Sequence, residues 1–341
     1  MLWLFFVGFI VMILGFIALD LGLIGSKAHV ISVREALLRT LGWVSLAMAF
    51  NVLVYFMYEH HWLGIGQHMR NAAGQVVVVP GAAAAEQFFT GYLLEYSLSM
   101  DNMFVIATIF AYFNIPLIHQ HRVLFWGIMG ALILRGIMIT LGVVIVAKFS
   151  WVLYIFGALL ILTAVKMAFS KSEEIHPSRN IVVRLARRMY PVTASIEGSH
   201  FFADVTRPDG KVMRAMTPLF LALILVETSD VMFAVDSIPA IFIITQDPFI
   251  IFTSNVFAIC GLRSLYFALA GLMDKFRYLK ASLVFLLAYI GVKMLISLWV
   301  HIPTRLTLVI VVSALAIGVI ASVAADRMGK KHHPDNGTPR H

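Results

Sequence analysis

Long apolar runs separated by short polar stretches dominate this chain of 341 residues. A helix needs about 20 mainly apolar residues to cross the hydrocarbon core of a bilayer, and runs of about this length recur throughout. The first run has no basic leading segment and no clear small-residue cleavage site, so we expect a retained span rather than a signal peptide. The nine predicted spans are 2–24, 41–58, 88–112, 123–147, 150–169, 217–244, 249–271, 279–299 and 304–324.

Composition supports a membrane protein over a soluble one. Hydrophobic residues make up 60% of the chain, charged residues only 13%, and the mean hydropathy is +0.90. A soluble domain usually carries about 25% charged residues, so a lipid bilayer is the expected partner of this surface. The single cysteine, Cys260, excludes a disulfide framework and a cysteine metal site within one chain.

The basic residues predict the orientation. Most of the 26 Lys and Arg residues fall in alternate connections between the spans and in the C-terminal tail. Because cytoplasmic loops are enriched in Lys and Arg, we place the N-terminus outside and the C-terminus in the cytoplasm. The net charge of +8 therefore reports topology, with some attraction to anionic headgroups, and nucleic-acid binding is the weaker interpretation.

The segment 170–216 is the one sizeable polar insertion between spans. Arg184, Arg187 and Arg188 beside apolar residues predict a short basic amphipathic helix. Pro208-Asp209-Gly210 predicts the turn of a small hairpin. We interpret the segment as a cytoplasmic connector, and a role in docking protein partners is the alternative. The tail 325–341 is polar, and we expect it to be disordered.

An internal repeat changes the expected architecture. EYSLSMDN at 95–102 resembles DVMFAVDS at 230–237, and later matches align Arg135 with Arg263 and Lys166 with Lys293. Since each copy holds three helices, the two copies cross the membrane in opposite directions, as in many secondary transporters. Chance similarity among apolar helices is the alternative interpretation.

The predicted fold is thus an all-α polytopic transmembrane helix bundle with an inverted 3+3 helix repeat. Its parts follow the order of the chain. They are an N-terminal two-helix unit at 1–60, a first three-helix repeat at 88–169, the cytoplasmic loop 170–216, a second, inverted repeat at 217–299, a final span at 304–324 and the tail 325–341.

Acidic residues inside the spans are the main candidates for chemistry. A charge at the bilayer centre costs about 3 kcal/mol on insertion scales, so each must face the bundle interior, pair with a basic residue, bind a cation or be protonated. They are Asp20, Glu95, Asp101, Glu227, Asp230 and Asp236.

The spacing of these acids makes a prediction about the helices. Glu227 and Asp230 are three residues apart and share a helix face. Asp230 and Asp236 are six apart, which is about 240° around a straight helix, and Glu95 and Asp101 repeat this spacing. If each pair serves one site, the helix must break between its members, as in many transporters.

The available ligands are hard oxygen donors. Asn102, Ser237 and the accessory Asn255 join the carboxylates, a set that suits Mn²⁺, Ca²⁺ or Mg²⁺ and fits Zn²⁺ or Cu⁺ poorly. No organic cofactor is expected. Arg135 and Arg263 lie within spans, and either hold the bundle together by pairing with an aspartate or act as internal counter-ions.

Three further charged residues lie nearer the ends of their spans. For Asp20, interfacial pairing is at least as good an interpretation as an accessory metal role. Lys166 and Lys293 are expected to extend their ammonium groups toward the membrane surface.

EYSLSMDNMFV and VETSDVMFAVDSIPAIF carry a resemblance to a known family. They resemble the TerC family of integral membrane proteins, in particular its Alx-like branch, which is related to LysE-like exporters. The resemblance implies a multi-pass protein of the bacterial inner membrane, associated with manganese export, an alkaline-induced response and tellurium resistance. It implies the metal path Glu95, Asp101, Asn102, Glu227, Asp230, Asp236 and Ser237.

Three functions are weighed. The leading one is export of divalent cations, most readily Mn²⁺, by alternating access. A non-transporting scaffold or metal-loading partner in a stress-resistance complex is the alternative, and an intramembrane aspartyl hydrolase is a third. The sequence lacks H-E-x-x-H and G-x-S-x-G motifs, so we expect no enzyme. Because carboxylates repel the tellurite oxyanion, any tellurite phenotype is expected to be indirect.

Overall fold

The computed structural model is almost entirely helical. It describes residues 2–20, 32–67, 69–70, 76–149, 151–169, 181–193, 200–206, 212–269, 279–297, 299–300 and 302–332. Its long helices are α1 (Leu2–Asp20), α2 (Val33–Glu59), α3 (Gly81–Tyr112), α4 (Leu117–Lys148), α5 (Val152–Phe169), α7 (Pro218–Phe242), α8 (Pro248–Leu269), α9 (Leu279–Ile296) and α10 (Thr304–His332).

These helices coincide with the predicted spans and confirm an all-α polytopic bundle. Within the described residues, seven of them are long and apolar enough to cross a membrane, namely α2, α3, α4, α5, α7, α8 and α10. The described part of α1 contributes a shorter apolar stretch, Val7–Ile17. The count of nine spans stays a prediction.

Prolines set where several of these helices begin. Pro80, Pro116 and Pro303 directly precede α3, α4 and α10, while Pro218 and Pro248 are the first residues of α7 and α8. Proline suits these positions because its fixed φ matches the first helical turn, where its missing N–H would have no partner.

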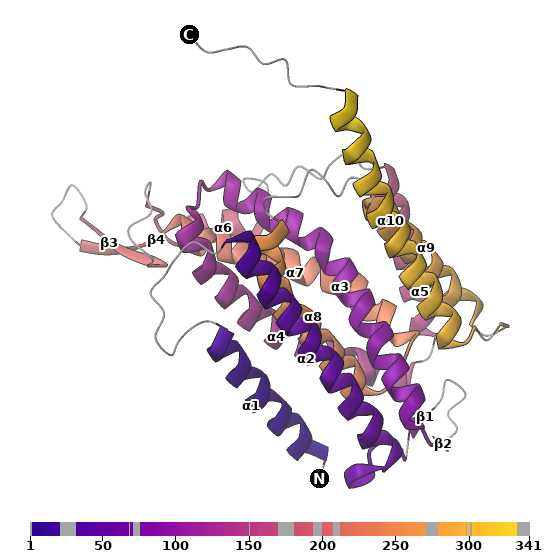
Figure 1. The fold of residues 1–341 in the computed structure, drawn as a ribbon. Helices are drawn as coiled ribbons and strands as arrows, with labels where there is room; N and C mark the ends of the chain where they lie inside the picture. Colours follow the sequence, from indigo (N-terminus) through magenta and orange to yellow (C-terminus); the bar gives the residue numbers. More distant parts are fainter. Residues whose placement is uncertain are drawn as a thin grey trace.

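The two triplets α3–α5 and α7–α9 pack against each other across the bundle (Figure 1). Helix α3 packs on α8 and α4 packs on α7, while α5 packs on α9. Exchanging the triplets would leave this set of partners unchanged, which is compatible with the predicted inverted repeat. The repeat itself stays a prediction.

The two ends of the bundle carry different polar segments (Figure 1). Helix α6 (Ile181–Met189) and the hairpin of β3 (Phe202–Thr206) and β4 (Val212–Met216) lie at what we call the α6 end. The short strands β1 (Met69–Arg70) and β2 (Val76–Val77) lie at the opposite end. The amphipathic helix and hairpin predicted within 170–216 are thus confirmed, although the turn at 208–210 falls outside the described residues.

Two sequence-based expectations about helix continuity were wrong. Helix α3 runs without a break through Glu95 and Asp101, and α7 runs through Asp230 and Asp236 and past Pro239. The predicted break assumed that both acids of a helix serve one site, and the structure sends them to different places. Helix α10 also continues to His332, past the predicted start of the tail at 325; residues 333–341 lie outside the described part.

Candidate functional site

One buried arginine lies at the centre of the bundle. The Arg135 side chain on α4 is 2% exposed and contacts three other helices. Its Nε and Nη2 donate to Oδ2 and Oδ1 of Asp230 on α7, at 3.1 and 2.9 Å. Its Nη1 donates to Oδ1 of Asn255 on α8 at 3.1 Å and contacts Oε1 of Glu95 on α3. A single guanidinium therefore bridges a carboxylate from the first helix of each triplet.

Neutral side chains complete the shell of both carboxylates. Asn255 Nδ2 donates to Glu95 Oε2 at 3.0 Å, and Ser99 Oγ donates to Glu95 Oε1 at 3.1 Å. Asn102 Nδ2 donates to Asp230 Oδ1 at 3.2 Å. Each acceptor oxygen is thus satisfied, which is how buried charges avoid the full cost of desolvation. We call Glu95 and Asp230 the inner pair.

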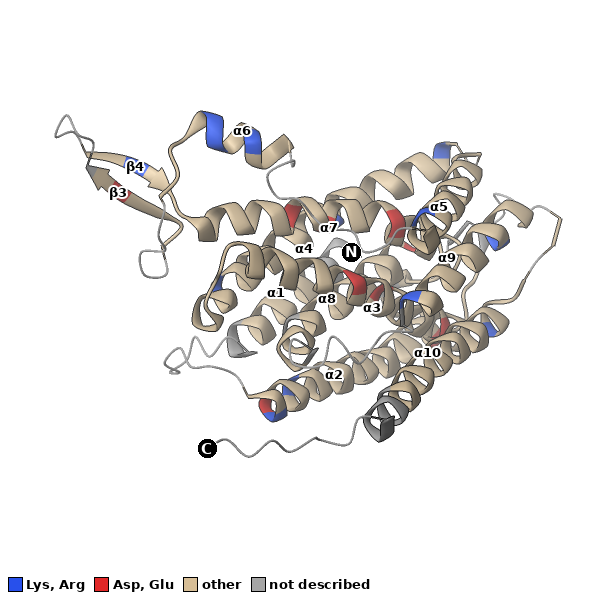
Figure 2. Ribbon diagram, turned by 90° about the horizontal axis from the view of Figure 1, so that it is seen from above, with Lys and Arg blue, Asp and Glu red and all other residues tan. Residues whose placement is uncertain are grey.

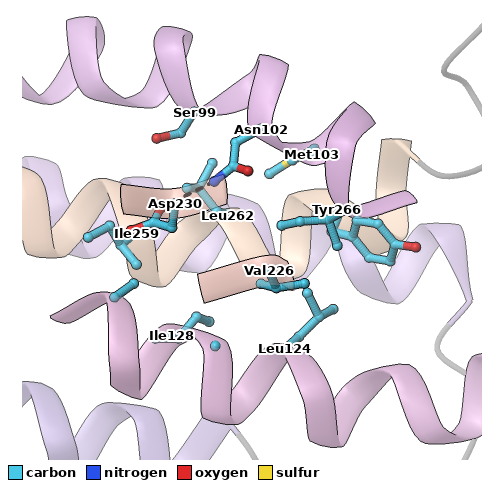
Figure 3. Close-up of a pocket in the computed structure, with 13 residues that line it drawn as sticks. Ser99, Asn102, Met103, Leu124, Ile128, Val226, Asp230, Ile259, Leu262 and Tyr266 are labelled. Carbon is cyan, nitrogen blue, oxygen red and sulfur yellow. Dashed lines mark hydrogen bonds between the residues drawn. The ribbon is translucent and has the colours of Figure 1, made fainter. Parts of the chain in front are cut away.

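A cavity of about 50 Å³ adjoins this network, between α3, α4, α7 and α8. That is room for a few water molecules. Polar groups line one part of it, from Ser99, Asn102 and Asp230, and the remaining wall is apolar. Figure 3 shows the Asn102 amide nitrogen directed at Asp230 and the Tyr266 hydroxyl directed away from it. The Asn102 Oδ1 atom is buried and has no hydrogen-bond partner among the described residues.

The cavity lies on one side of the network only. The residues that line it on α3 and α8 come after Glu95 and Asn255 in the sequence, and those on α4 come before Arg135. Each of these directions leads to the α6 end. On the other side, Phe88 and Phe249, near the starts of α3 and α8, belong to a packed aromatic cluster. The inner pair is therefore closer to access from the α6 end.

One further acid on α3 and one on α7 follow the inner pair by six residues and face in other directions. Asp101 and Asp236, which we call the outer pair, are half-buried. Asp236 Oδ1 accepts a hydrogen bond from Thr163 Oγ1 on α5 at 3.0 Å. Figure 2 shows acidic positions on both α3 and α7. Straight helices explain the separation, because residues six apart face in different directions.

Glu227 and Ser237 are buried or half-buried polar groups on α7. The Glu227 carboxyl group lies against Gly130 of α4, where a Cβ atom would overlap it. Its Oε2 atom and the Ser237 hydroxyl are buried without a hydrogen-bond partner among the described residues. Glu227 thus lies one turn before Asp230, and Ser237 lies two turns after Asp230 on the same side of the straight helix.

Two predicted residues, Asp20 and Arg263, have side chains outside the described set. The expectation for Lys293 was wrong, because it is 5% exposed and donates to Thr307 Oγ1 on α10 at 2.7 Å rather than extending to the surface. Lys166 is exposed, and the extension of its ammonium group toward the membrane surface stays a prediction. The polar partner of Lys293 is a threonine on the neighbouring helix α10, so the sequence of α9 alone could not identify it.

Sequence reasoning missed Ser99 and Gly130 as parts of the site. Ser99 is one helical turn after Glu95, so its spacing could have identified it. Gly130 has no such signal, since the Glu227 side chain that packs on it comes from another helix. Within the described residues, no three His, Cys, Asp or Glu side chains form a metal-holding group. A cation here would need Asn and Ser oxygens beside the carboxylates.

Comparison with known proteins identifies the family. Residues 80–332 match the family described as "Integral membrane protein TerC family". The chain belongs to the TerC family. It is similar to the uncharacterized membrane protein STKORF319 of Myxococcus xanthus, with 44% identity over 94% of this chain and 92% of that protein.

Other TerC relatives carry the name Alx. Proteins named "Putative membrane-bound redox modulator Alx" from Escherichia coli K12 and Salmonella typhi are 43% and 42% identical, over 92% of each chain. No solved structure matches this chain. The multi-pass membrane character and the resemblance to the Alx-like branch are confirmed.

Proposed function

We propose that this TerC protein exports divalent metal cations, most readily Mn²⁺, through the inner pair. The two three-helix units would move against each other and expose the pair to one side of the membrane at a time. The proposal places the protein in the bacterial inner membrane with the α6 end in the cytoplasm, as the distribution of Lys and Arg favours.

The observation that carries the proposal is the shared guanidinium. Glu95 and Asp230 come from different triplets, are almost fully buried, and among the described residues pair with the single cation Arg135. Ionisable groups buried inside membrane proteins typically mark substrate or ion pathways. A cation that reached this place would compete with the guanidinium for the same oxygens.

The ligand set supports a hard divalent cation. Carboxylates of the inner pair, the free Oδ1 of Asn102 and the nearby Glu227 are oxygen donors of the kind that Mn²⁺, Mg²⁺ and Ca²⁺ prefer. The adjoining cavity supplies an approach from the α6 end. In this mechanism Arg135 balances the carboxylates whenever the cation is absent and withdraws when it binds.

The alternating-access part of the proposal is supported by a difference between the two sides of the Arg135 network. The α6 side has the cavity, while Phe88 and Phe249 pack tightly on the other side. Export would require these sides to exchange, with the aromatic cluster opening as the cavity closes. Protons replacing the metal on the outside would supply a driving force.

A second candidate is a non-transporting scaffold or metal-loading partner. The β3–β4 hairpin and α6 extend from the α6 end and offer it a surface (Figure 1). The name of the Alx relatives points to redox balance. Here the one cysteine, Cys260, is 3% exposed within α8, so we propose that any redox or tellurium phenotype follows indirectly from metal balance.

The test is transport by the purified chain in liposomes that contain a dye quenched by Mn²⁺. We expect saturable Mn²⁺ movement that Glu95→Gln or Asp230→Asn reduces more than about 100-fold, since each removes a direct ligand rather than an outer one. Asp101→Asn and Asp236→Asn should give smaller losses. Isothermal titration of Mn²⁺ against Mg²⁺, Ca²⁺ and Zn²⁺ then ranks the metals.

The matched control is Glu86→Gln on the same helix as Glu95. Glu86 pairs with the exposed Arg305 and does not line the cavity, so this variant should transport normally. Folded protein that moves no Mn²⁺ would support the scaffold. Full transport by Glu95→Gln and Asp230→Asn would reject the inner pair as the site.

A further inference from the structure

Helix α6 presents three distinct faces around its axis. At about 100° per residue, Val183 and Ala186 share one face, and the three arginines share a second. The third face holds Ile181, Val182, Leu185 and Met189. The apolar third face and the basic second face lie side by side.

Among the described residues, protein covers the first face. Val183 is 1% exposed and belongs to a buried cluster with Leu219 and Leu225 of α7, on which α6 packs. The third face stays open, with Ile181 70% exposed, Leu185 56% and Met189 67%. Tyr190, directly after the helix, is 52% exposed. With Val182, which is 43% exposed, the third face of this nine-residue helix thus presents four adjacent apolar side chains outward.

The position of α6 in the bundle indicates what its open apolar face can contact. Its buried contact is with the first two turns of α7, the stretch where a membrane-crossing helix leaves the headgroup layer. Figure 2 shows α6 on the outside of the bundle, beyond α7, with basic positions along it, and the three arginines are exposed. A helix that is fixed at this depth and open to the outside meets the bilayer surface.

We propose that α6 is an interfacial helix that binds acidic phospholipids. Ile181, Leu185 and Met189 insert at the boundary between headgroups and acyl chains, where an amphipathic helix usually lies. Arg184, Arg187 and Arg188 bind the lipid phosphates, because guanidinium groups pair with phosphate through two parallel hydrogen bonds. The partner is therefore the anionic leaflet at the α6 end. This inference does not depend on the proposed transport.

The test measures the depth of Leu185 in the full-length chain. A nitroxide is attached to Leu185→Cys in a Cys260→Ser background, and the protein is reconstituted in vesicles. One set contains phosphatidylcholine alone, and the other contains about one-third phosphatidylglycerol. Collision with oxygen reports the lipid phase, and collision with a nickel chelate reports water. In the anionic vesicles we expect the label about 5–10 Å below the phosphates.

Charge variants and a position control isolate the arginines. Replacing Arg184, Arg187 and Arg188 together by Gln should move the label to the nickel-accessible zone, and about 1 M salt should act in the same direction. Replacing all three by Lys should retain the depth. Val212→Cys on β4, which is 67% exposed, should be nickel-accessible in every vesicle.

Three outcomes would overturn the proposal. A nickel-accessible Leu185 label in anionic vesicles would place the open face in water. A label shielded from both oxygen and nickel would show that a protein surface, such as a second copy, covers it. If the label lies at the same depth in both vesicle types, and the Gln substitutions do not change that depth, acidic lipid is not what α6 binds.

Discussion

The inner and outer pairs of acids show how strongly depth decides the chemistry of a carboxylate. The sequence presents them as equivalents, because each pair takes one acid from each half of the predicted repeat. In the structure Glu95 and Asp230 meet at one guanidinium and are almost fully buried. Asp101 and Asp236 are half-buried, and Asp236 accepts from a neutral hydroxyl.

The difference teaches that two similar motifs need not form one site. A buried carboxylate requires a cation or several donors, since desolvation otherwise costs several kcal/mol. A half-exposed one keeps part of its hydration and requires less. The inner pair is therefore the place where a substrate cation would replace a fixed charge, and the outer pair would act on the route to it.

The largest expected effect comes from removing the charge that the inner pair shares. Arg135→Gln leaves Glu95 and Asp230 buried without a cation, so we expect a loss of about 3–5 kcal/mol in unfolding free energy. Thr163→Val removes one hydrogen-bond donor from the outer Asp236, and we expect a loss of about 0.5–1.5 kcal/mol. Urea unfolding of both variants in detergent measures the contrast.

The double variant Arg135→Gln with Asp230→Asn provides the internal control. Because the two residues contact each other, removing both should cost less than the sum of the single changes. Equal losses from Arg135→Gln and Thr163→Val would mean that burial does not distinguish the two pairs.

A smaller effect tests how tightly Glu227 is held beside the inner pair. Gly130→Ala places a methyl group where the Glu227 carboxyl group now lies, so that side chain must move. We expect a loss of about 1–3 kcal/mol, typical of overpacking, with weaker Mn²⁺ binding by titration. Gly136→Ala on the same helix is the matched control. Its added Cβ would meet only Phe252 at 3.4 Å, and normal stability is expected.

If Gly130→Ala and Gly136→Ala behave alike, the close approach of Glu227 to α4 has no consequence. A loss of stability in Gly130→Ala with unchanged Mn²⁺ affinity would separate packing from binding, and it would leave the inner pair alone as the candidate site.

The architecture was predictable because membrane-spanning helices produce long apolar runs in the sequence. Apolar runs set the helices, prolines set several starts, and the pattern of Arg184, Arg187 and Arg188 located α6. Each of these features depends on residues that are close in sequence, so no knowledge of packing was needed.

The candidate site was predictable in its residues but not in their grouping. Buried acids had to face inward on energetic grounds, and Glu95 and Asp230 do. That Arg135 binds both, and that Asn255 joins them, depends on how four helices pack. The predicted helix breaks failed for the same reason, because spacing along one helix does not reveal which acids share a partner on another.

The smallest expected effect on stability concerns Asp247, a buried acid whose environment differs from those of the inner and outer pairs. It lies in the connection between α7 and α8, and it accepts hydrogen bonds from neutral donors, the Tyr58 hydroxyl and the Phe249 N–H. Burial raises the pKa of Asp247 above its usual range, and these hydrogen bonds offset part of that rise. The comparison with the inner pair is thus between neutral donors and a guanidinium.

The sign of the pH dependence follows from the raised pKa. A group with a higher pKa in the folded state contributes stability below its unfolded pKa and loses it as the pH rises through the folded value. Wild-type protein should therefore lose stability from Asp247 as the pH rises above the usual range of aspartate. Asp247→Asn should flatten this slope, while Tyr58→Phe, which removes a donor that lowers the pKa, should extend the loss to higher pH. Thermal unfolding in detergent across about pH 4–8 measures it, and parallel curves for wild type and Asp247→Asn would show that burial at this end leaves the carboxyl unperturbed.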